Sequence, residues 1–194
     1  MPPVDIGERL RSLPGGSAVA LKLDPRDYAD HYFAVLNATL RDVGTETDAH
    51  TIYVAVTNPA AFVWTLAQAL DVPIDRISFV DAISHIMMNY ANPLPNATYV
   101  ESPRALEEIM LRVEYLLRKF PHPRSTVVID SVNSLAIHNP PELLNEFFHI
   151  LLNNLKSRSV LTLVLETSEE EATGVEQMLN LVVDETIDVA RGGR

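Results

Sequence analysis

The chain has 194 residues, of which 47% are hydrophobic and 21% are charged, a balance typical of a folded domain and not of a disordered chain. Its 26 acidic residues outnumber 15 Lys and Arg, so the formal net charge is -11. A general nucleic-acid binder is disfavoured because an acidic surface repels phosphate backbones. The chain contains no cysteine, which excludes disulfides, thiolate metal sites and thiol catalysis.

The start of the chain has no basic segment followed by an apolar one, and no stretch offers the ~18 apolar residues that a bilayer span needs. We therefore expect a cytoplasmic protein without a membrane partner. No repeat or long linker divides the sequence, so we predict one domain over residues 1–194, with a flexible Gly-rich tail at 191–194.

Seven short apolar runs predict β-strands along the chain. Most of them are apolar at consecutive positions instead of alternating, which is typical of strands covered on both faces of a sheet. The last run is expected at an edge of the sheet. In chain order the runs are residues 18–23, 51–56, 77–80, 98–100, 126–130, 160–165 and 186–189.

The segments between these runs carry signals of helix starts. Four of them begin with an N-cap residue followed by proline, which is accepted at the first helical position because the N–H that it lacks has no partner there. A fifth start, Ser168 with Glu171 three residues later, has the pattern of a capping box. The four doublets are Asp24-Pro25, Asn58-Pro59, Ser102-Pro103 and Asn139-Pro140.

Two of the helices have a clear apolar stripe, which predicts that they lie on a sheet. A third, residues 60–70, is apolar almost all round and is expected to be deeply buried. The least regular stretch is the connection 81–97, with a short helix expected around residues 83–88. The stripe after Pro103 consists of Leu106, Ile109, Met110, Val113, Leu117 and Phe120, and the stripe after Pro140 of Leu143, Leu144, Phe147, Phe148, Leu151, Leu152 and Leu155.

Strands that alternate with helices predict right-handed crossovers between parallel strands. The predicted fold class is therefore α/β, a three-layer sandwich with a mostly parallel core sheet. In open parallel sheets, ligands bind at the carboxyl ends of the strands. Candidate site residues are therefore expected at that edge.

Several segments, in this order, resemble the core of a known family. They are the lead-in to the first strand at 13–17, the second strand and its turn at 52–59, the next helix end and strand at 70–81, the strand 126–131 and the closing stretch 160–189. Over nearly its whole length the chain resembles the RecA-like ATPases of the KaiC group. The resemblance implies a RecA-like core sheet and assigns 126–131 to the Walker B strand.

The segment that corresponds to the family's phosphate-binding loop departs from the pattern G-x-x-x-x-G-K-[ST]. In that loop, glycines bring backbone N–H groups to the phosphates, the Lys neutralises them and the Ser or Thr holds Mg²⁺. Residues 22–32 contain no glycine, and no Lys, Ser or Thr stands at the end of the loop. Asp24 is expected to cap the helix. Together with Asp27 and Asp30 it is also expected to repel a triphosphate, and Arg26 is the one cation among these three acids.

The family commonly places an acidic pair at the end of its second strand, where a carboxylate activates the attacking water. This sequence has Thr57-Asn58-Pro59 there, and an amide such as Asn58 cannot act as a general base. Asp130 remains at the Walker B position, and without a loop to share Mg²⁺ we interpret it as a vestige or a turn acceptor. The chain resembles the family but departs from it at both of these positions, so we expect it to bind no cofactor and to have no catalytic residue.

No other group of residues forms a recognised catalytic or metal-binding pattern. The six histidines fall in no known ligand spacing. Ser131 or Ser134 with His138 lacks both a nucleophile elbow and a third member, so chance explains that combination better. We therefore predict no metal site.

We predict a non-catalytic RecA/KaiC-like pseudo-ATPase that acts as a protein-interaction or regulatory module. The resemblance implies an archaeal signalling role and association with a protein partner, with a second copy of the chain or with an active relative. Two alternatives stay open: a small-molecule sensor or enzyme that reuses the crevice, and a DNA recombination or repair accessory protein, against which the charge of -11 counts. The vestigial crevice is expected to be lined by Asp24, Arg26, Asn58, Asp130 and Ser131.

Overall fold

The computed structural model describes residues 5–44, 49–87, 93–167 and 173–189. Its seven strands form one sheet in the order β4-β3-β2-β5-β6-β1-β7, and every neighbouring pair is parallel. The strands are β1 (Ala18–Leu23), β2 (Ala49–Ala55), β3 (Ile77–Asp81), β4 (Ala97–Tyr99), β5 (Arg124–Asp130), β6 (Leu161–Thr167) and β7 (Glu185–Asp188). All seven predicted strands are confirmed, and the last one does lie at an edge.

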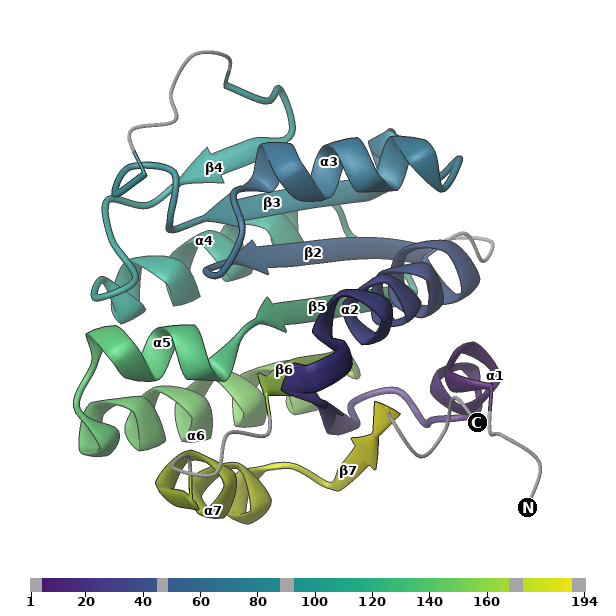
Figure 1. Cartoon of the computed structure of the whole chain (residues 1–194). Helices are drawn as coiled ribbons and strands as arrows, with labels where there is room; N and C mark the ends of the chain where they lie inside the picture. The colour runs from purple at the N-terminus through teal and green to yellow at the C-terminus, as the bar shows by residue number, and fades with distance from the viewer. Residues whose placement is uncertain (1–4, 45–48, 88–92, 168–172, 190–194) are drawn as a thin grey trace.

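Helices cover both faces of this sheet, which confirms the three-layer α/β sandwich with a RecA-like core (Figure 1). The described α-helices are α1 (Ile6–Arg11), α2 (Tyr28–Leu36), α3 (Ala60–Ala69), α4 (Leu106–Lys119), α5 (Val132–His138), α6 (Pro141–Ser157) and α7 (Thr173–Val182). Short 3₁₀ turns η1 (Pro25–Asp27) and η3 (Ile74–Arg76) precede α2 and β3, and α2 continues into the π-helical segment η2 (Asn37–Val43).

Alternate residues of each strand pack into one of two hydrophobic cores, because successive side chains in a strand point to opposite faces. Val19 and Leu21 of β1 belong to the core under α1, α2 and α3. Ala18 and Ala20 belong to the core under α4, α5, α6 and α7. The strands are apolar at consecutive positions because both of these cores need apolar residues.

Of the four predicted N-cap and proline doublets, one is confirmed as written. Asp24 Oδ1 accepts a hydrogen bond of 2.9 Å from the Arg26 backbone N–H at the start of η1. The prediction for Ser102 was wrong, since α4 begins only at Leu106. Ser102 Oγ instead accepts from the Arg104 backbone N–H at 3.2 Å, in a turn before the helix.

The two asparagine doublets were also wrong, because each helix starts one residue later than predicted. Pro59 and Pro140 themselves occupy the N-cap positions of α3 and α6, with extended ψ angles of 146° and 145°. The Asn139 side chain donates instead to the backbone carbonyls of Pro103 and Leu135, at 3.0 and 2.9 Å. Asn139 is therefore the C-cap residue of α5, and it does not cap the start of α6.

Asp81, at the end of β3, caps α3 in place of Asn58. Its Oδ2 accepts from the Ala60 backbone N–H at 2.8 Å and from the Ser84 hydroxyl at 2.7 Å. Its Oδ1 accepts from the backbone N–H groups of Ile83 and Ser84, at 3.0 and 2.8 Å. One fully buried carboxylate therefore fixes both the start of α3 and the turn after β3.

Helix α3 is not deeply buried, contrary to its prediction. It buries one stripe, Ala60, Val63 and Ala67, while Phe62 is 46% exposed. In α6 the predicted stripe is buried except for Leu143, which is 53% exposed. Both helices form outer layers of a sandwich, so part of their apolar surface faces solvent.

Residues 81–87 of the irregular connection contain a turn in place of the predicted short helix. The backbone N–H groups of Ile86 and Met87 both bond to the carbonyl of Ile83. The remainder of that helix prediction, the capping box at Ser168 and the tail at 191–194 lie outside the described residues. Within the described ranges, no helix combines the length and the apolar composition of a membrane span.

Candidate functional site

Asp130 lies at the carboxyl end of β5, between β2 and β6 in the centre of the sheet. Its side chain is 0% exposed. Its backbone carbonyl accepts two hydrogen bonds, from the N–H groups of Val56 and Thr57, at 2.8 and 2.9 Å. The end of β2 is thereby held against the end of β5, which places Thr57 and Asn58 beside Asp130.

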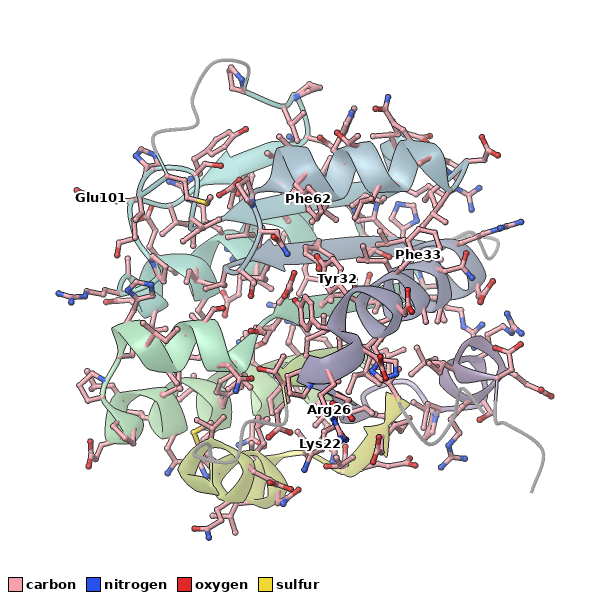
Figure 2. All side chains as sticks on the ribbon, in the orientation of Figure 1. Lys22, Arg26, Tyr32, Phe33, Phe62 and Glu101 are labelled. Atoms are coloured by element: carbon pink, nitrogen blue, oxygen red, sulfur yellow. The ribbon has the colours of Figure 1, made fainter. Side chains whose placement is uncertain are left out.

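Two tyrosine hydroxyls enclose the Asp130 carboxyl group. Tyr32 of α2 and Tyr53 of β2 both donate to Asp130 Oδ2, at 2.8 and 2.7 Å, and their own oxygens lie 3.0 Å apart. Tyr32 reaches this position from the face of the sheet that α2 covers (Figure 2). Asp130 Oδ1 has no hydrogen-bond partner among the described residues.

The surroundings of Asp130 favour its protonated form. Burial raises its pKa, and the hydrogen bonds from Tyr53 and Tyr32 only partly oppose this. Burial, followed by the neighbouring Asp130, also raises the pKa of Tyr53 well above its usual value. Burial and the direction of the pKa shift therefore both favour the neutral form of Asp130.

A second layer of hydroxyl groups continues this polar cluster toward α5. Thr57 Oγ1 lies 2.7 Å from Ser134 Oγ and donates to Ser131 Oγ at 3.1 Å. Ser131 caps α5 by accepting from the Ser134 backbone N–H at 3.3 Å. Asn58 lies close enough to Tyr32 to lower the pKa of its hydroxyl, although burial raises that pKa overall. Three predicted site residues, Asn58, Asp130 and Ser131, are thus brought together.

The other two predicted residues, Asp24 and Arg26, pair with each other at the end of β1. Arg26 Nη2 lies 2.7 Å from Asp24 Oδ2, and this side-chain contact is the largest cause that lowers the pKa of Asp24 to about 2. The Asp24 backbone N–H donates to His31 Nδ1 at 3.2 Å. Among the described residues, no hydrogen bond or ion pair joins this pair to Asp130, and β6 lies between β1 and β5.

Lys22, near the carboxyl end of β1, lies among acidic residues of neighbouring elements. Its Nζ lies 2.7 Å from Glu176 of α7, and its register partners are Glu166 on β6 and Asp188 on β7. The Glu176 hydrogen bond is the largest cause that raises the pKa of Lys22, while burial raises the pKa of Glu166. This arrangement binds α7 to the sheet by charge pairing.

The sequence did not single out Tyr32, Tyr53, Thr57 or Ser134 as neighbours of Asp130 in this cluster. A signal was present, because Tyr53 carries a hydroxyl group in the middle of a mostly apolar strand, and a buried phenol normally finds a partner. Among the described residues, no group of three or more His, Asp and Glu is placed to hold a metal ion. The cluster is therefore a hydrogen-bonded assembly of hydroxyls around one buried acid.

Comparisons with known proteins agree with this fold. The model of a family described as "ATPase: KaiC" matches residues 43–192. Among solved structures, the KaiC-like protein PH0186 from the hyperthermophilic archaeon Pyrococcus horikoshii OT3 is similar, with a TM-score of 0.61 and 13% sequence identity over 91% of this chain and 73% of that chain. No curated protein matches the chain. At this identity the structural likeness supports the fold alone.

Proposed function

The chain belongs to the KaiC family of ATPase domains, and we propose that it is a member that has lost nucleotide binding and acts through protein contacts. The contact between Tyr32 and Asp130 carries this proposal. A family member that binds Mg-ATP needs an ionised, accessible carboxylate at the Walker B position, and here a phenol hydroxyl covers a buried acid whose pKa is raised by burial. A protonated carboxyl is a poor ligand for Mg²⁺, which prefers charged oxygen.

The segment between β1 and α2 supports the same proposal. The Asp24 side chain accepts the Arg26 backbone N–H, so the protein itself uses a donor that a phosphate would need. Pro25 removes another N–H at that turn. The match to the family model also begins at residue 43, after this segment. A triphosphate would therefore meet negative charge here, without a cradle of backbone donors.

The end of β2 supports a loss of hydrolysis in addition to a loss of binding. Asn58 occupies the place where the family commonly has a catalytic carboxylate, and it lies close to the Tyr32 hydroxyl. An amide cannot remove a proton from water. A sensor or enzyme that reuses this crevice would need open space around Asp130, and the 0% exposure of Asp130 favours filled packing instead.

The proposed protein contacts find support in apolar side chains on the surface. Phe33 of α2 and Phe62 of α3 are 47% and 46% exposed and lie on the same face of the molecule (Figure 2). Ile137 and Leu181 are exposed still further, at 80% and 77%. Exposed aromatic residues are favoured at protein interfaces. The proposed partner is a second copy of the chain or an active relative.

Thermal unfolding with and without Mg-ATP tests the loss of nucleotide binding. A ligand that binds only the folded state adds about 2.7 kcal/mol of stability at a hundredfold excess over its Kd. We expect Mg-ATP to change the Tm of this protein no more than Mg²⁺ alone does. The Tm of an active family member, measured in parallel as a control, should rise with Mg-ATP. A shift that disappears in Asp130→Asn or Arg26→Gln would overturn the proposal and restore the enzyme hypothesis.

The oligomeric state tests the proposed contacts separately. We expect mass to rise with protein concentration, alone or with an active relative added, and the double variant Phe33→Ser/Phe62→Ser to reduce this association. Leu111→Ser, at a site that is 54% exposed on α4, is the matched control. A chain that stays monomeric under both conditions would contradict this part of the proposal.

A further inference from the structure

A cavity of about 130 Å³ lies at the amino-terminal edge of the sheet, at the opposite end of β5 from Asp130. It is enclosed by the end of α1, the turn at residues 13–15 and the first residues of β5 and β6. In Figure 1, β2, β3 and β5 run toward the left and α1 lies at the right. Thr126 is the last residue of β5 that lines the cavity, and it lies four residues before Asp130, roughly 13 Å away at about 3.3 Å per residue.

The floor of this cavity is apolar and buried. Leu10, Val43 and Leu161 line it, and they are only 1%, 8% and 9% exposed. One wall is backbone at Gly15, where an added Cβ would lie 3.0 Å from the Ser159 carbonyl oxygen. An apolar cavity of about 150 Å³ stays dry and binds benzene. The volume and the lining therefore suit an apolar group the size of one ring.

Arginines stand at the cavity, although the protein as a whole is acidic. Arg11 and Arg124 line the cavity, and none of its twelve lining residues is Asp or Glu, in a chain with a net charge of -11. Arg11 forms no ion pair with any residue that the structure describes. A guanidinium is the group best suited to bind a carboxylate through two parallel hydrogen bonds.

We propose that this cavity binds a small apolar carboxylate. Its ring or short chain packs on Leu10, Val43 and Leu161, and its carboxylate pairs with the guanidinium of Arg11 at the rim. Because the cavity shares no residue with the Asp130 cluster, this proposal does not depend on the loss of nucleotide binding. It assigns a ligand site to the edge of the sheet that faces away from the strand carboxyl ends.

Amide NMR spectra of the isotope-labelled full chain, titrated with benzoate, test the proposal. We expect saturable shifts confined to α1 and the starts of β5 and β6, with a Kd in the millimolar range or tighter for so small a ligand. Arg11→Gln should weaken binding about tenfold, as expected for loss of a charged hydrogen bond. Arg118→Gln, at an exposed arginine outside the cavity, should leave the Kd unchanged.

Benzamide, which has the same ring without the charge, separates shape from charge. We expect it to bind about tenfold more weakly than benzoate to the unaltered chain and equally to the Arg11→Gln variant. Three results would overturn the proposal: shifts that do not saturate, shifts located elsewhere in the chain, or equal affinities for benzoate and benzamide. A loss of benzoate binding in Arg118→Gln of the same size as in Arg11→Gln would also overturn it.

Discussion

Tyr32 and Asp130, which are 98 positions apart in the sequence, form a buried hydrogen bond of 2.8 Å that joins α2 to the end of β5. The hydroxyl of Tyr53, on the neighbouring strand β2, donates a second hydrogen bond to the same Asp130 oxygen at 2.7 Å. Helix α2 is therefore fixed over the central carboxyl end of the sheet by a polar contact in addition to its apolar face. In a KaiC-family domain this is the region where the phosphates would lie.

Tyr53→Phe removes one donor from Asp130 and should lower the free energy of unfolding by about 1–2 kcal/mol, because Oδ2 then loses a buried hydrogen bond. Urea denaturation measures the difference. Tyr115→Phe, at a tyrosine that is 46% exposed on α4, is the control and should change stability by less than about 0.5 kcal/mol. Equal losses in the two variants would contradict the structural role of the Tyr53 hydroxyl.

Asp130→Asn tests whether the buried acid is neutral. If it is protonated, an amide of the same shape replaces it with a stability change of less than about 1 kcal/mol, whereas Asp130→Ala leaves two phenols without an acceptor and costs about 2–4 kcal/mol. Denaturation of the two variants at neutral pH provides the comparison. A large loss of stability in Asp130→Asn would show that the charged form is needed.

Asp81→Ala should be strongly destabilising, by about 3 kcal/mol, because one donor at the start of α3 and three donors in the turn after β3 then lose their acceptor. Asp75→Ala, at an exposed acid in η3, is the matched substitution and should be near neutral. Amide exchange adds a local readout, since the N–H of Ala60 should lose protection. A mild effect of Asp81→Ala would mean that Asn58 caps α3 after all.

Leu143 and Leu144 are adjacent residues in α6 that differ sharply in burial, at 53% and 1% exposed. Leu144→Ala should cost about 2–4 kcal/mol through lost packing and a residual cavity, whereas Leu143→Ala should cost less than about 0.5 kcal/mol. Chemical denaturation of both variants is sufficient. Similar losses would show that α6 is rotated relative to the structure described, or that Leu143 is covered by a partner.

His50 makes stability depend on pH at the amino end of β2. Its ring lies between Phe120 and His122, with centroid distances of 4.9 and 5.2 Å, and its Nε2 lies 3.0 Å from Ser78 Oγ. Burial, and next the nearby His122, lower the pKa of His50 from 6.5 to about 4, while Asp75 opposes the shift. The folded protein therefore holds His50 neutral.

Between pH 6.5 and about 4 the unfolded chain binds the His50 proton more readily than the folded protein does. This contribution to stability is complete above pH 6.5 and should be lost as the pH falls through that window, by up to about 3 kcal/mol. Unfolding free energies of the unaltered chain and of His50→Gln, measured against pH, isolate the effect. His149→Gln, at an exposed histidine, should keep the original slope.

The sequence predicted the strands well because a strand buried on both faces needs apolar residues at consecutive positions, and that pattern is local. It also marked Asn58, Asp130 and Ser131, since each follows a strand that ends at the same edge of a parallel sheet. All three therefore lie at that edge. Asp24 and Arg26 lie at the end of β1, and the sequence did not state that β6 lies between β1 and β5.

Local patterns were less reliable where a distant group competes for the same backbone donors. The doublet Asn58-Pro59 has the pattern of a helix cap, yet the Ala60 backbone N–H donates its hydrogen bond to Asp81, at the end of β3. Nothing near Asn58 in the sequence indicates this. The exposure of Phe62 in α3 was missed for a related reason, because burial depends on which elements lie outside a helix.

By itself the sequence determined the elements, the parallel sheet and the absence of a glycine-rich phosphate loop, because each depends on residue types within a short window. Only the tertiary structure decided which side chain covers Asp130 and where a cavity lined in part by arginines remains. Both depend on contacts between residues far apart in the chain, and the geometry of such contacts follows from packing that no local pattern encodes.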